Sequence, residues 1–104
     1  MNDIEFCRVL EIETATLNLW VEERWIIPGG DHGMLYYGDA DLARGRLILD
    51  LLKNMGVNDA GVDVVVDLVD QLHTLREQMR SVMDAIRQQD VTVQRSLRRA
   101  LDAM

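Results

Sequence analysis

The sequence predicts a mainly α-helical protein in which a small helical domain with a β-hairpin precedes one long helix. The first observation is a stripe of apolar residues at alternating spacings of three and four, which is the spacing of a helix face. The stripe consists of Val65, Leu68, Leu72, Leu75, Met79, Val82 and Ile86. The second observation is a glycine-rich segment, residues 29–33, between shorter helical patterns. We therefore expect three parts, at residues 1–58, 59–89 and 90–104.

The apolar stripe also indicates that the long helix packs against a second chain. Val69 and Met83 lie beside it and widen the apolar face, so this helix needs more than one neighbour. A short helix draws most of its stability from packing, and little chain remains to cover so wide a face. We expect a homodimer with the stripe as its interface. A core helix inside a monomer is the alternative interpretation.

The first part has the pattern of a winged helix-turn-helix. Apolar residues at helical spacing occupy residues 4–10 and then residues 14–24, where Thr14 is a suitable N-cap. Residues 25–27 and 34–37 are expected to pair as the hairpin, or wing, across residues 29–33. A third helix is expected from Asp39, its N-cap, to Gly56, in which Gly45 marks close packing.

The end of the chain has its own pattern. Asn58 is expected to cap the long helix, and Asp90 a short terminal one. The terminal segment, residues 90–104, combines an apolar face with several arginines. This basic tail has three possible roles: it folds onto the acidic body, reaches a partner, or frays.

The composition of the chain limits the class of partner that it is expected to bind. The 104 residues include 11 Lys and Arg against 18 Asp and Glu, a formal charge of −7. Phosphate contacts need a surplus of cations, so a basic protein is expected as the partner in place of nucleic acid. With Cys7 as the only cysteine, no signal peptide pattern and no membrane span, we expect a cytoplasmic, soluble protein.

Several short segments carry a family resemblance when they are read in order. They are Glu5-Phe6-Cys7, Ile26-Ile27-Pro28, Tyr36-Tyr37-Gly38-Asp39-Ala40-Asp41-Leu42, Leu52-Lys53-Asn54-Met55-Gly56-Val57-Asn58, Gly61 and Leu68-Val69-Asp70-Gln71-Leu72. Over residues 4–80 the chain resembles the MerR-like group and, within it, the CbpM chaperone-modulator family. The resemblance implies a dimeric protein with a MerR-like winged helix-turn-helix and a long C-terminal dimerisation helix. It also implies binding and inhibition of the J-domain of a DnaJ/CbpA-type co-chaperone. Trp20, Trp25 and the basic tail depart from the family pattern.

The expected recognition helix, residues 15–24, presents Asn18, Glu22, Glu23 and Arg24 where a DNA reader would present cations and amides. Carboxylates repel phosphate, so an acidic partner-binding surface is expected. Its residues are Glu22, Glu23, Asp31, Asp39 and Asp41. The resemblance implies a basic second helix in the J-domain, which matches this charge. Alternatively, these acids are only solvated helix ends and caps.

The aromatic residues and the cysteine are expected to have structural roles. Trp20 and Trp25 are expected in the core, and one residue of the Tyr36–Tyr37 pair is expected to face solvent. Cys7 is expected to be buried and inert. Asp70 and His73 could share a helix face, and His32 is far away in the sequence, so no metal site is expected from them. No catalytic residue or cofactor site is expected either.

Two other functions remain open. One is a MerR-like DNA-binding transcription regulator, for which Arg8, Arg44, Arg46 and the tail arginines are the support. The other is an antitoxin or assembly factor for an unrelated basic protein.

Overall fold

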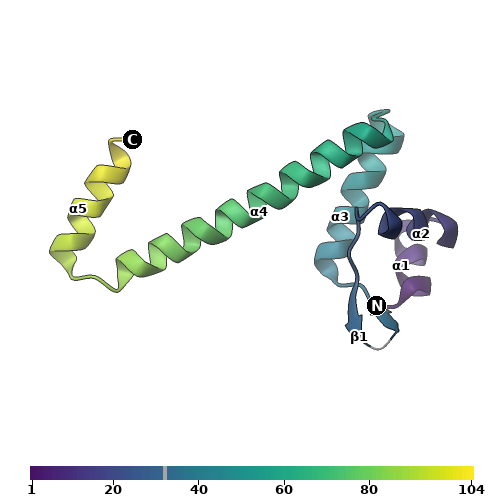
Figure 1. The fold of residues 1–104 in the computed structure, drawn as a ribbon, viewed down its shortest axis with the longest axis horizontal. Helices are drawn as coiled ribbons and strands as arrows, with labels where there is room; N and C mark the ends of the chain where they lie inside the picture. The colour runs from purple at the N-terminus through teal and green to yellow at the C-terminus, as the bar shows by residue number, and fades with distance from the viewer. Residues whose placement is uncertain (32) are drawn as a thin grey trace. The chain divides into compact units, whose positions relative to one another are not determined.

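The structure is a computed structural model that describes residues 1–31 and 33–104. The elements follow in the order α1 (Asp3–Leu10), α2 (Thr14–Glu22), β1 (Gly29–Asp31), β2 (Met34–Tyr36), α3 (Asp39–Leu49), the π-helical turn η1 (Asp50–Asn54), α4 (Asp59–Arg87) and α5 (Val91–Asp102) (Figure 1). The prediction of a mainly helical chain with one small hairpin is confirmed. Contacts divide the chain into unit 1, Met1–Val66, and unit 2, Asp67–Met104.

Unit 1 has a single apolar core, to which every one of its helices contributes. Helix α1 packs against α2 and α3 (Figure 1). The fully buried side chains are Phe6, Leu17, Trp20, Ile26, Tyr37, Ile48 and Val62. The rings of Phe6 and Tyr37 are stacked with centroids 4.5 Å apart. Trp25 is buried as well, so the prediction that both tryptophans belong to the core is confirmed.

The hairpin differs from the predicted one. Strand β1 is Gly29–Asp31 and pairs antiparallel with β2, with Gly30 opposite Leu35. The prediction that residues 25–27 form the first strand was wrong. Trp25 and Ile26 are buried in the core of unit 1, where removal of their apolar surface from water stabilises the fold more than a place in an exposed hairpin would. Gly30 has φ +125°, and a Cβ there would lie 1.9 Å from the Met34 carbonyl oxygen, so this position of β1 requires glycine.

Some predicted helix ends are displaced by one residue. Helix α2 begins at Thr14, so its N-cap is Glu13. Helix α3 begins at Asp39, and Gly38 precedes it. The Gly38 N–H donates a hydrogen bond to Asp41 Oδ2 at 2.9 Å. The N-cap assignments of Thr14 and Asp39 were therefore wrong. At α3 the physical reason is that the Asp41 carboxylate reaches back to the Gly38 N–H.

The third helix is not α-helical throughout. It runs as α3 to Leu49 and continues as η1 before Gly56, which has φ +65° as expected of a glycine that ends a helix. Gly45 is buried, and a Cβ at this position would lie 2.6 Å from Leu10 Cδ1. The prediction of close packing at Gly45 is confirmed.

The long helix is present as α4. Asn58 Oδ1 accepts a hydrogen bond from the Gly61 N–H at 2.8 Å, so Asn58 is its cap as predicted. Val62 and Val66, in its first turns, complete the core of unit 1. In unit 2, Asp90 Oδ1 accepts from the Val93 N–H at 2.9 Å and caps α5, also as predicted. The part of the chain that the structure describes holds no helix with the length and apolar content to cross a membrane.

Candidate protein-interaction surfaces

The end of α2 concentrates negative charge. Glu22 is the last residue of this helix and Glu23 is its C-cap, and both are exposed. The C-terminus of a helix carries a partial negative charge that disfavours carboxylates. No basic residue lies in the last turn of α2 to offset it. The two glutamates therefore place negative charge at the end of the helix that a DNA reader would insert into the major groove, with the exposed Arg24 next to them.

The other predicted acidic residues have different surroundings. Asp39 is exposed in the first turn of α3, whereas Asp41 is partly buried and serves the Gly38 N–H. Asp31 lies in β1, and its side chain, like the whole of His32, lies outside the described residues. Only Glu22, Glu23 and Asp39 are therefore seen with exposed carboxylates. Asp41 has the structural role that the alternative interpretation gave it.

Unit 1 holds all of the net charge of the chain. Residues 1–66 contain twelve Asp and Glu against five Lys and Arg, whereas residues 67–104 contain six of each. The charge of −7 thus belongs to the helix-turn-helix unit, and unit 2 is neutral. Unit 1 is a poor match for a polyanion and a good match for a basic surface.

The hairpin presents an apolar surface that the sequence analysis missed. Met34 and Tyr36 of β2 are 78% and 61% exposed, and Ile4 of α1 is 67% exposed. A hollow of about 310 Å³ lies between Ile4, Met34 and Leu35, with Asn2 and Asp3 at its edge. The apolar run Met34-Leu35-Tyr36 in a two-stranded sheet was the available signal, because so small a sheet has little protein to cover it. The predicted contrast within the tyrosine pair is confirmed, since Tyr37 is buried.

The buried titratable groups of unit 1 are held neutral. Burial, together with the nearby carboxylate of Asp3 and its hydrogen bond with the hydroxyl, raises the pKa of Tyr37 to about 12. Burial and then Asp3 also raise the pKa of the Cys7 thiol, while a hydrogen bond with Thr14 lowers it. A buried thiol with a raised pKa is a poor nucleophile, as predicted for Cys7. Among the described residues, no group of three or more His, Cys, Asp or Glu side chains is arranged to hold a metal ion.

The apolar stripe of α4 is largely exposed. Leu68, Leu72, Leu75, Met79 and Val82 are each about half exposed, between 46% and 58%. The stripe's two ends are covered within the chain, because Val65 packs against the core of unit 1 and Ile86 is buried in unit 2. A row of five large apolar side chains along one exposed helix is the kind of surface that marks a protein interface.

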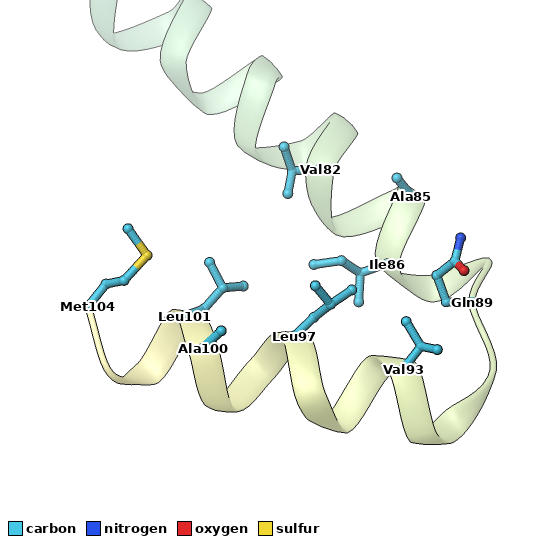
Figure 2. A pocket seen from close by; sticks show the side chains of 9 residues that line it. All are labelled: Val82, Ala85, Ile86, Gln89, Val93, Leu97, Ala100, Leu101 and Met104. Carbon is cyan, nitrogen blue, oxygen red and sulfur yellow. The ribbon is translucent and has the colours of Figure 1, made fainter.

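Helix α5 lies beside the end of α4 and forms a groove with it. Figure 2 shows the side chains of the two helices facing each other, close at the turn after Gln89 and diverging toward Val82 and Met104. The groove has a volume of about 380 Å³. Its main lining residues are Val82, Ala85 and Ile86 from α4 and Val93, Leu97 and Leu101 from α5. The Gln94 side chain donates to the Gln89 carbonyl oxygen at 2.8 Å and fixes the turn.

The order of two short helices joined by a tight turn, a hairpin, a third helix and a long helix is that of a helix-turn-helix protein. The model of the MerR HTH family regulatory protein matches residues 3–83, and the chain belongs to this family. No curated protein and no solved structure matches the chain. The MerR-like part of the sequence resemblance is thereby confirmed.

Proposed function

We propose that this protein is a chaperone modulator that binds and inhibits the J-domain of a DnaJ/CbpA-type co-chaperone in the cytoplasm. Membership of the MerR family supports a regulatory role, and the resemblance to CbpM proteins narrows it to the J-domain. The observation that carries the proposal is the exposed Glu22 and Glu23 pair at the end of α2. These glutamates lie on the helix whose usual partner is DNA, in a unit of charge −7.

Electrostatic complementarity explains what this surface contributes. An acidic patch accelerates encounter with a basic helix and selects its orientation, while apolar contacts supply most of the affinity. The exposed hairpin residues Met34 and Tyr36 are apolar contacts of this kind on the same unit. An interface that combines carboxylates with apolar side chains suits an amphipathic basic helix. Binding there would occupy the J-domain without any chemical step.

The stripe of α4 supports a dimer. Half-exposed leucines at positions 68, 72 and 75 gain roughly 1 kcal/mol each when a second helix covers them. Unit 2 is neutral, so two copies meet through it without net repulsion. In this proposal α4 joins two copies, and each copy presents its own acidic unit to a J-domain.

The competing function is that of a MerR-like DNA-binding transcription regulator, which the name of the matching family favours. Arg8, Arg24, Arg46 and Lys53 are exposed on unit 1 and are the cations available to it. Twelve acidic residues on the same unit oppose phosphate contact, so this function is the second candidate.

The deciding experiment is a pair of calorimetric titrations of the purified protein at near-physiological salt. One titrant is the J-domain of a DnaJ homologue from the same source, and the other is duplex DNA. Micromolar or tighter binding to the J-domain, without heat from DNA, is the expected result. DNA binding that weakens steeply with salt, together with no J-domain heat at several temperatures, would establish the transcription regulator.

A further inference from the structure

The outer edge of strand β2 is paired at one position. On this edge the Tyr37 N–H donates to the Met1 carbonyl oxygen at 2.8 Å, and the Met1 amino group donates to the Tyr37 carbonyl oxygen at 2.7 Å. This reciprocal exchange is the hydrogen-bonded pair of antiparallel strands. Met1 therefore lies beside the end of the hairpin as a residue of a third strand would (Figure 1).

The pairing does not continue to Leu35. Asn2 is the N-cap of α1 and the chain enters this helix at Asp3, so it does not run on along β2. The backbone groups of alternate residues in a strand point to opposite edges, so those of Leu35 point to the same edge as those of Tyr37. Among residues 1–31 and 33–104, no residue outside the hairpin forms a hydrogen bond with the Leu35 backbone. The edge of β2 at Leu35 is therefore open.

The hollow beside the hairpin lies at this open position. Its lining residues come from the start of the chain, Asn2, Asp3 and Ile4, and from β2, Met34 and Leu35. Its volume is about 310 Å³. Sites that bind an extended peptide by adding it to a sheet combine these two features: the open edge supplies backbone hydrogen bonds, and a pocket beside it accepts a side chain.

The charge at the start of α1 is negative. Asp3 lines the hollow, whereas none of the lining residues is Lys or Arg. Glu5 lies in the same first turn of α1 and is exposed. The amino group of Met1 contributes one positive charge against these two carboxylates. A peptide with basic residues next to an apolar one matches both the charge and the hollow.

We propose that the edge of β2 at Leu35 and the adjacent hollow bind an extended segment of a partner protein, in which an apolar residue is flanked by Lys or Arg. The N–H and C=O groups of one residue of the segment pair with those of Leu35. An apolar side chain of the segment enters the hollow beside Ile4, and a basic side chain approaches Asp3. The site does not use the acidic end of α2, so the inference goes beyond the proposed function.

A designed peptide tests this site in the full-length protein. The probe is an acetylated and amidated heptapeptide of alternating lysine and valine, which offers a valine to the hollow in every register. It is titrated into nitrogen-15-labelled protein. Binding with a dissociation constant of about 1 mM or below is expected, because a short edge offers few hydrogen bonds. Hydrogen exchange of the Leu35 amide should slow about fivefold or more at saturation, since this N–H is then paired. No binding, or binding that leaves the Leu35 amide unchanged, overturns the proposal.

A proline tests the backbone pairing. Leu35 lies opposite Gly30, and its N–H points away from β1, so Leu35→Pro removes the outward donor without breaking a hydrogen bond of the hairpin. This variant is expected to raise the dissociation constant of the peptide about tenfold or more. Leu35→Val, which keeps the N–H, is the control and should stay within about threefold. Equal affinities of the two variants would exclude the pairing.

A second pair of variants leaves the backbone unchanged and decides the case if Leu35→Pro fails to fold. Ile4→Lys places a cation at the hollow and is expected to weaken peptide binding about tenfold. Val9→Lys makes the same change at an exposed position of the same helix and should have a much smaller effect. Equal losses would show that only the total charge matters, and would overturn the site. The J-domain titration uses another probe, so a negative result here leaves the proposed function standing.

Discussion

The indole N–H of Trp25 donates a hydrogen bond to a carboxylate oxygen of Asp63, 38 residues away. Trp25 lies in the loop after α2 and is 2% exposed, and Asp63 lies in the second turn of α4. The same loop is held from the other side, where Arg44 Nε donates to the Trp25 carbonyl oxygen. Trp25 thereby ties the helix-turn-helix to the first turns of the long helix.

Removal of the Asp63 carboxylate should show how much its hydrogen bond with Trp25 contributes to the stability of the folded protein. Asp63→Ala leaves the buried indole N–H without its partner and is expected to lower the free energy of unfolding by about 1–2 kcal/mol. Asp59→Ala, one turn earlier, loses only a favourable interaction with the helix N-terminus, about 0.5 kcal/mol. Urea unfolding followed by tryptophan fluorescence measures both. Equal losses would mean that the hydrogen bond contributes nothing of its own.

Stability should fall at high pH because of Tyr37. Its pKa of about 12 in the folded protein lies above the ordinary value near 10, so the unfolded chain releases the proton first. The contribution is complete below pH 10 and is lost as pH rises to about 12, by up to roughly 2–3 kcal/mol at 1.4 kcal/mol per pKa unit. Urea midpoints between pH 8 and pH 11.5 should decline less for Tyr37→Phe. Parallel declines in the two proteins would contradict this account.

Charge reversal at the end of α2 should weaken J-domain binding. Glu22→Lys with Glu23→Lys is expected to raise the dissociation constant about tenfold or more, mainly through a slower association rate. Glu5→Lys with Glu11→Lys changes the net charge of the same unit equally and serves as the control. Stopped-flow association at two salt concentrations separates the effects. If both pairs slow association alike, the total charge matters and the position of Glu22 and Glu23 does not.

Leu72→Asp should abolish the dimer. Leu72 is 46% exposed within one chain, so aspartate costs little there and becomes unfavourable only when a second helix covers it. Sedimentation velocity is expected to show monomers with helical circular dichroism retained, whereas Ser81→Asp, also exposed on α4, leaves the dimer intact. A well-folded Leu72→Asp dimer would exclude the stripe as the interface.

Loss of the α5 cap should loosen the end of the chain. Asp90→Ala removes the acceptor for the Val93 N–H and is expected to cost about 1 kcal/mol of local helix stability. Amide hydrogen exchange in α5 should accelerate severalfold, while unit 1 is unaffected. Asp102→Ala at the other end of α5 provides the comparison. Unchanged exchange at Val93 and its neighbours would show that groove packing alone holds α5.

Much of this protein is readable from the sequence because the relevant physics is local. The period of the stripe from Leu68 to Val82 predicts α4, and the short polar side chains of Asn58 and Asp90 predict where helices begin. The formal charge of −7 also follows from the sequence alone, because it depends only on composition. The prediction of an N-cap at Asp39 failed. The N-cap is Gly38, whose backbone N–H donates a hydrogen bond to the Asp41 carboxylate.

The tertiary structure decided what local patterns leave undetermined. Trp25 and Ile26 have good strand propensity, yet the core of unit 1 buries them and the hairpin forms from glycines instead. The exposure of Met34 and Tyr36 and the groove between α4 and α5 appear only once the helices are packed. Burial is a property of how segments distant in sequence meet, whereas helical periodicity and charge belong to the chain itself. The sequence by itself therefore determined the helices and the net charge, and the packing decided which side chains remain exposed.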